Sequence, residues 1–128
     1  TTISETVRQE LERWSHPDLL KGDKISDKKD YNARAQAKIP RNEKLLALFD
    51  LSILRKSAKK CLVIGENGIY FTGPAQLSWN EFAKAQIGEP EGDRLTIGGR
   101  ILDVTGLSDQ KALTDMLRNL QQVVRRSI

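Results

Sequence analysis

The fold of this chain is decided by the stretch CLVIGENGIYF at residues 61–71. Two apolar runs of strand length, residues 61–64 and 69–71, lie on either side of the dipeptide Asn67-Gly68. Asn and Gly tolerate the positive φ angles that a tight hairpin turn requires. The stretch therefore predicts an antiparallel β-hairpin in which the second run folds back on the first.

Further apolar runs of strand length lie on both sides of this hairpin. Residues 45–49 precede it, and residues 77–82, 94–97 and 100–104 follow it. The last two runs flank Gly98-Gly99, which is a second turn signal. Short apolar runs separated by turn residues are typical of antiparallel strands. In the 77–82 run, we expect Leu77 and Trp79 to lie on one face.

A C-terminal helix is predicted over residues 109–126, with Ser108 as a favourable N-cap. Its apolar stripe follows the helical period and comprises Leu113, Met116, Leu117, Leu120, Val123 and Val124. A helix with so broad an apolar stripe must cover another apolar surface. We expect it to pack on the sheet and to share a core with Leu62, Ile64 and Trp79.

The first 38 residues are predicted to be mainly helical. A helix over residues 4–15 carries one apolar stripe made of Ile3, Val7, Leu11 and Trp14. A second helix is predicted over residues 29–38, after a loop in the polar segment 18–30. The first stripe must be buried either against the rest of the chain or against another protein. We therefore name its four residues as candidates for partner binding.

The order of these segments resembles the bacterial pleckstrin-homology-like (PH-like) domains. In that family an apolar strand ending in Asp, here Asp50, precedes a hairpin with a Gly-Ile-Tyr return, here residues 68–70, and then a strand with Leu, Ser and an aromatic residue, here residues 77–79. The resemblance covers about residues 39–124. It implies an α+β fold, an antiparallel β-barrel or sandwich capped by a C-terminal α-helix, over residues 39–128. Residues 1–38 then form an N-terminal helical extension.

Two features depart from the PH-like pattern. The first inter-strand loop is basic, where the family often has a Gly-containing sequence, and the last helix lacks the Trp of eukaryotic PH domains. The family motifs are structural signatures, so the resemblance implies a fold and carries almost no information on function.

Composition places the chain among soluble globular domains. It has 128 residues, of which 38% are hydrophobic and 30% charged, and this balance fits one domain with one core. No apolar run approaches the roughly 20 residues of a membrane-spanning helix, and the N-terminal residues do not resemble a secretory signal. Cys61 is the single cysteine, which fits a reducing compartment. We expect a cytoplasmic location and, because no Met precedes Thr1, a place within a larger protein.

No constellation of residues predicts an enzyme. The single histidine, His16, precedes a proline at a predicted helix end, and Cys61 begins an apolar strand, where thiols are usually inert. The acidic residues of the 89–93 segment lack the ligand spacing of a calcium-binding loop. The segment 65–68 is too short for a phosphate-binding glycine loop. We therefore expect no catalytic residue, metal site or cofactor.

The excess positive charge lies in the first half of the chain. Residues 1–60 hold 14 Lys and Arg against 9 Asp and Glu, and the remainder holds 7 against 8. Between the first two predicted strands lies the basic loop 55–60, with Arg55, Lys56, Lys59 and Lys60. Such a loop attracts anionic lipid at about 1 kcal/mol per cation, or binds nucleic acid, or is a solvated surface. Few aromatic residues lie near it, which counts against stacking on bases.

The sequence thus predicts a binding module without catalytic activity. The favoured interpretation is docking of a protein or peptide partner. The alternative is an anionic-surface binder, for acidic lipid or nucleic acid, through the basic loop 55–60.

Overall fold

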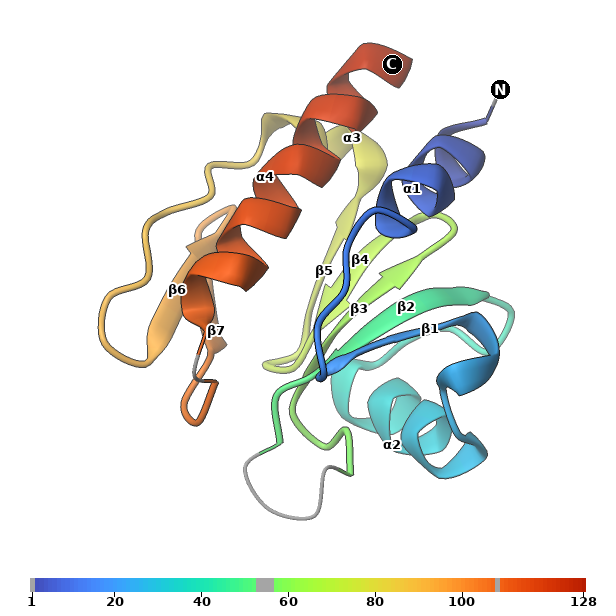
Figure 1. Cartoon of the computed structure of the whole chain (residues 1–128), viewed down its shortest axis with the longest axis vertical. Coiled ribbons are helices and arrows are strands. Elements are labelled where there is room, and N and C mark those ends of the chain that lie inside the picture. The colour runs from blue at the N-terminus through green and yellow to red at the C-terminus, as the bar shows by residue number, and fades with distance from the viewer. Residues whose placement is uncertain (1, 53–56, 108) are drawn as a thin grey trace.

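Five antiparallel strands form the central sheet of the computed structural model, which describes residues 2–52, 57–107 and 109–128 (Figure 1). The order across the sheet follows the chain: β1 (Leu19–Lys21), β2 (Leu45–Asp50), β3 (Cys61–Gly65), β4 (Gly68–Phe71) and β5 (Ala75–Ser78). Neighbouring strands pair antiparallel throughout. Strands β1 and β5 are therefore the edges of this sheet.

The predicted central hairpin is confirmed. Strands β3 and β4 pair with Leu62 opposite Phe71, and Ile64 opposite Ile69. The predicted turn at Gly98-Gly99 is also confirmed, with φ angles of 58° and 80°. It joins β6 (Arg94–Ile97) to β7 (Arg100–Asp103) in a separate two-stranded sheet.

The C-terminal helix is confirmed as α4 (Gln110–Ser127). Its N-cap is Asp109, whose side chain accepts a hydrogen bond from the Ala112 N–H at 3.0 Å. Ser108, the predicted N-cap, lies outside the described residues. Among the helices that the structure describes, none has the length and apolar character needed to cross a membrane.

The predicted strand over residues 77–82 is wrong beyond Ser78. Strand β5 ends there, and α3 (Trp79–Lys84) begins at the next residue. Ser78 and Glu81 form a capping box, in which each side chain accepts the backbone N–H of the other residue, at 3.2 and 3.0 Å. This local signal starts a helix and overrides the strand-like alternation, so Trp79 lies on α3 and not on a strand face with Leu77.

The N-terminal region contributes a strand as well as helices. Helix α1 (Ile3–Leu11) is shorter than predicted, and α2 (Asp27–Ala37) starts two residues earlier. The short helical turn η1 (Gly22–Lys24) and β1 lie in the segment predicted to be a loop. Strand β1 has three residues, too few for a period to be visible in the sequence, and it pairs with β2.

The central sheet separates two apolar cores. On one face, α1, α3, α4 and the β6–β7 hairpin pack on the sheet, and this core contains Leu62, Ile64 and Trp79 together with Leu113, Leu117 and Leu120 of α4. On the other face, Ala33 and Ala37 of α2 pack near Val63 and Tyr70. The predicted packing of α4 on the sheet is therefore confirmed.

The expected α+β class with a C-terminal helix is present, but no closed barrel is formed in the described part of the chain. The five-stranded and two-stranded sheets are separate, because β5 and β7 do not pair. Residues of the predicted N-terminal extension belong to the same sheet and core, through β1 and α1.

Replacing Leu117 with Ala tests the packing of α4. Leu117 is fully buried, and truncating such a side chain leaves a cavity, so the free energy of unfolding should fall by about 2 to 5 kcal/mol. Urea denaturation measures the change. The matched control Lys111→Ala lies on the exposed side of the same helix and should change stability by less than about 0.5 kcal/mol. Equal effects of the two variants would show that α4 does not pack on the sheet.

Deleting residues 1–24 tests whether the N-terminal segment belongs to the core. The deletion removes α1 and β1, exposing α4 and the edge of β2. We expect the remainder to lose cooperative unfolding and its near-ultraviolet circular dichroism. A remainder that stays folded and monomeric would contradict this, and would return the α1 stripe to the role of a partner surface.

Candidate functional site

The structure brings together only part of the predicted basic loop. Arg55 and Lys56 lie outside the described residues, and Lys59 is exposed. The Lys60 Nζ donates to Oδ2 of Asp103 on β7 at 2.6 Å. That hydrogen bond, followed by those from Thr105, lowers the pKa of Asp103 to about 2. The charge of Lys60 is therefore balanced within the chain.

The apolar stripe of α1 lies against the chain's own core. Val7 and Leu11 are buried, and Ile3 and Trp14 are partly buried against the same core. The Trp14 indole N–H donates to a Glu10 carboxylate oxygen at 3.0 Å. The stripe predicted to bind a partner thus contacts residues of this chain.

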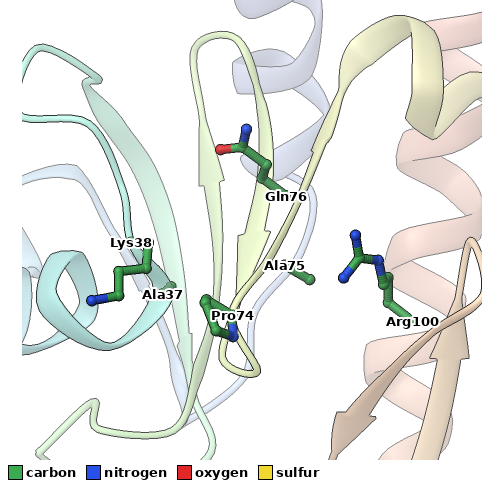
Figure 2. A pocket seen from close by; sticks show the side chains of 6 residues that line it. All are labelled: Ala37, Lys38, Pro74, Ala75, Gln76 and Arg100. Carbon is green, nitrogen blue, oxygen red and sulfur yellow. The ribbon is translucent and has the colours of Figure 1, made fainter.

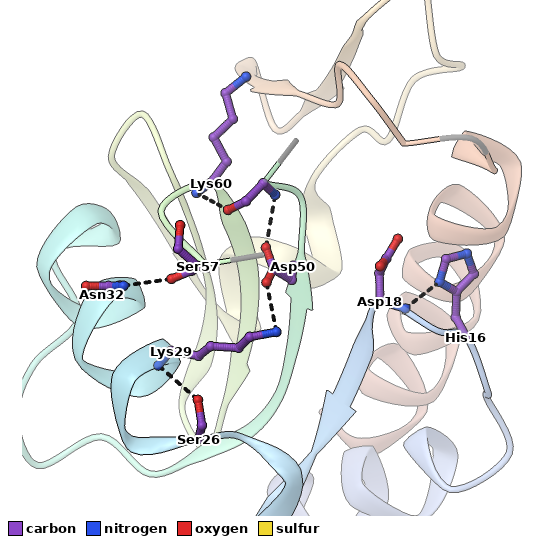
Figure 3. Close-up of polar contacts among 9 residues, drawn as sticks. His16, Asp18, Ser26, Lys29, Asn32, Asp50, Ser57 and Lys60 are labelled. Atoms are coloured by element: carbon purple, nitrogen blue, oxygen red, sulfur yellow. Dashed lines mark hydrogen bonds and ion pairs between the residues drawn. The ribbon is translucent and has the colours of Figure 1, made fainter. Parts of the chain in front are cut away.

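The side chains of His16 and Asp50, which could act in catalysis, make structural contacts instead (Figure 3). His16 accepts a hydrogen bond at Nδ1 from the Asp18 N–H at 3.0 Å, and its ring lies 5.0 Å from that of Phe49. Buried Asp50, at the end of β2, accepts from the Ser52 N–H, and its other carboxylate oxygen lies 3.1 Å from the Lys29 Nζ. These contacts tie loops and α2 to the sheet.

The thiol of Cys61 is buried opposite Asp50. Burial first, and then the negative charge of Asp50, raise the pKa of Cys61 to about 12. Since only the thiolate is nucleophilic, this cysteine is inert near neutral pH. Its environment is that of a core residue.

A thiol reagent tests this assignment of Cys61. The folded chain should react with a disulfide reagent at pH 8 at least about a hundredfold more slowly than the chain in denaturant, because both access and thiolate are suppressed. The pKa of the thiol is 9 in the unfolded chain and about 12 in the folded chain, so the unfolded chain loses this proton first. The free energy of unfolding should therefore keep its full value below pH 9 and fall as the pH rises toward 12. Rapid reaction of the folded chain at pH 8 would place the thiol at the surface.

The edge strand β5 offers backbone hydrogen-bonding groups to a partner. Backbone bonds alternate between the two sides of an antiparallel strand. The Thr72 N–H donates to the Cys61 carbonyl of β3. The backbone N–H and C=O of the preceding residue, Phe71 at the end of β4, therefore point toward β5. Phe71 is paired with Ala75 of β5, so the backbone N–H and C=O of Ala75 point back toward β4. By the same alternation, the N–H and C=O of Gln76 point away from the sheet.

At both ends of β5, no backbone N–H is available to a partner strand. Pro74, before β5, has no N–H. The N–H of Ser78 is held by the Glu81 carboxylate in the capping box. Gln76 thus stands at the centre of a short edge, with its side chain exposed.

Three cavities adjoin β5. The Arg100 cavity, of about 340 Å³, is lined by residues of β5 and by Lys38 and Arg100, which lie on opposite sides of β5 (Figure 2). The glycine cavity, of about 500 Å³, is bounded by Leu77, Ala85 and the Gly98-Gly99 turn. The Tyr70 cavity, of about 230 Å³, lies on the α2 side of β5 and is bounded by Tyr70 and Gln76.

Contacts near both ends of the β6–β7 hairpin help to hold it in place near β5. At Gly98, a Cβ would lie 3.3 Å from the Cβ of Ala85 and 3.4 Å from a methyl group of Leu77, so the turn rests closely against both. At the far end of β7, Asp103 is bound by Lys60. Between these points β5 and β7 face each other without pairing, and we call this gap the β5–β7 seam.

A buried polar cluster supports the wall of the Tyr70 cavity. The carboxylate of Glu43, which is 4% exposed, accepts hydrogen bonds from the Asn67 N–H, the Asn67 side-chain amide and the Tyr70 hydroxyl. Burial and then the contacts with Glu43 raise the pKa of Tyr70 above its usual range. The cluster fixes the β3–β4 turn to the start of β2.

Sequence reasoning did not find this site. Its cations, Lys38 and Arg100, come from separate elements that meet only in the fold. The signals that the sequence does hold are the Gly-Pro turn before β5 and the alternation of apolar and polar residues in Ala75–Ser78. In the described part of the chain, no three His, Cys, Asp or Glu side chains gather as metal ligands would.

Comparisons with protein-family models, characterised proteins and solved structures find no match to this chain. The resemblance to PH-like domains therefore stays a prediction. The candidate site is defined by its geometry alone.

Proposed function

We propose that this chain is a non-catalytic binding module that docks an extended segment of a protein partner along the edge of β5. The observation that carries the proposal is the outward direction of the Gln76 N–H and C=O on an edge strand bordered by three cavities. In strand addition, main-chain hydrogen bonds supply affinity, and pockets for alternate side chains supply specificity.

The cavities suit the two faces of an added strand. Successive side chains of a strand point to opposite faces of the sheet. The Tyr70 cavity lies on the α2 face of β5, while the glycine cavity lies on the face of Leu77. The blunted ends of β5 limit pairing to a short segment, which protects the edge from open-ended association.

The occupied states of Cys61 and His16 support a role without catalysis, since neither is free to act as nucleophile or base. We also propose that the fold is PH-like with an open seam, on the support of its consecutive antiparallel strands and C-terminal helix. We also propose a cytoplasmic location, on the support of a composition with a single cysteine, Cys61.

The alternative, an anionic-surface binder through the basic loop 55–60, draws less support from the described residues. Lys60 is paired with Asp103, which leaves Lys59 as the exposed cation of the described part of that loop. For Lys59 and Lys60, the cations of this loop that the structure describes, no geometry gathers them around one ligand.

Replacing Gln76 with Pro tests the proposed function. The substitution removes an N–H that points away from the sheet, so β5 should keep its pairing with β4. Peptides of about ten residues, long enough to pair along a strand, are first selected on the wild-type chain from a random library. Their dissociation constants, measured by fluorescence anisotropy, should rise about tenfold in the variant, which corresponds to about 1.4 kcal/mol.

The control variant is Gln76→Thr, which keeps the N–H and suits a strand. It should bind the selected peptides within about twofold of wild type, a change of less than 0.5 kcal/mol. Thermal unfolding by circular dichroism verifies that both variants are folded. Failure to select any peptide, or full binding by a folded Gln76→Pro variant, would refute docking at this edge.

A further inference from the structure

We propose that the docked segment carries acidic side chains at two consecutive positions, one directed toward Lys38 and the next toward Arg100. This inference rests on the proposed strand addition and names the chemistry of the partner. It follows from the positions of two cations on opposite sides of β5 (Figure 2).

The two cations lie on opposite faces of the central sheet. Lys38 ends α2, which packs on the face that contains Val63 and Tyr70. Arg100 begins β7, whose Leu102 belongs to the core on the other face. A strand placed along β5 therefore passes between them.

Gln76 sets the register of the added strand. A residue directly opposite Gln76 in an antiparallel pair points to the same face as Gln76. That face is the α2 face, because Gln76 is also opposite Tyr70. The next residue, opposite Ala75, points to the other face, where Ala75 joins the core and Arg100 borders the cavity.

Charge complementarity identifies these two residues of the partner. Lys38 and Arg100 are the charged residues that line the Arg100 cavity, and both are exposed. Neither takes part in an ion pair among the described residues. Arg100 acts electrostatically on Glu81, whose carboxylate already caps the Ser78 N–H.

The same charges disfavour a second copy of this chain as the occupant. Pairing of β5 with β5 of another copy would bring Lys38 and Arg100 of both copies to one edge. Like charges facing each other across an interface are unfavourable. An acidic peptide replaces that repulsion with two ion pairs.

The test uses the peptides selected from the random library and two charge variants. Lys38→Asn removes the charge from a residue in the left-handed conformation, with φ of 57°, which Asn tolerates. Arg100→Gln removes the second charge. Each variant should weaken binding about fivefold, the effect of an exposed ion pair of about 1 kcal/mol. The double variant Lys24→Asn with Arg126→Gln, at exposed positions outside these cavities, controls for net charge.

Peptide substitutions assign each acid to its cation. The selected sequences should share two adjacent Asp or Glu residues, and replacing either by its amide should weaken binding to wild type about fivefold. The affinity of Lys38→Asn should not change when one of the two acids is replaced, and the affinity of Arg100→Gln should not change when the other is replaced. This reciprocal pattern distinguishes direct pairing from a general attraction to a basic protein.

The outcomes separate this inference from the proposed function. Peptides that bind wild type, lose affinity in Gln76→Pro and lack adjacent acids would overturn the inference and leave docking intact. An equal loss in the control double variant would overturn it too, since the attraction would then be unspecific. A dimer in size-exclusion chromatography that Gln76→Pro abolishes would make a second copy the occupant. If no peptide is selected, both proposals fail.

Discussion

Burial of the middle strands on both faces is the constraint on which the rest of this structure depends. Every residue of β2, β3 and β4 is buried, so the sheet must be covered twice. Helix α4 covers one face together with α1 and α3, and α2 covers the other. The helices of the first 38 residues therefore complete the core on both faces.

The elements that could be predicted are those with a strong local signal. Asn67-Gly68 and Gly98-Gly99 specify hairpin turns through their backbone freedom, and the stripe of α4 is long enough for its period to be unmistakable. Strand β1 escaped detection because three residues show no period, and it exists through its pairing with β2. The end of β5 was missed because Ser78 and Glu81 cap a helix where the apolar pattern favoured a strand.

The candidate site could not be predicted for a different reason. It depends on which edges the fold leaves unpaired, and no local pattern states that β5 and β7 stop short of pairing. The basic loop was visible as a cluster in the sequence, yet Lys60 is engaged by Asp103 from β7. Proximity along the chain was therefore a poor guide to which cations share a site. Lys38 and Arg100 are far apart in the sequence, yet both border one cavity.

Two of the contacts that hold the β6–β7 hairpin differ in their physical nature. Gly98 rests on Ala85 and Leu77 through apolar contact, which screening ions leave unchanged. Lys60 and Asp103 form a partly exposed ion pair, and such pairs weaken as counterions accumulate. The contact at the turn of the hairpin is therefore insensitive to salt, whereas the ion pair at the opposite end weakens as the salt concentration rises.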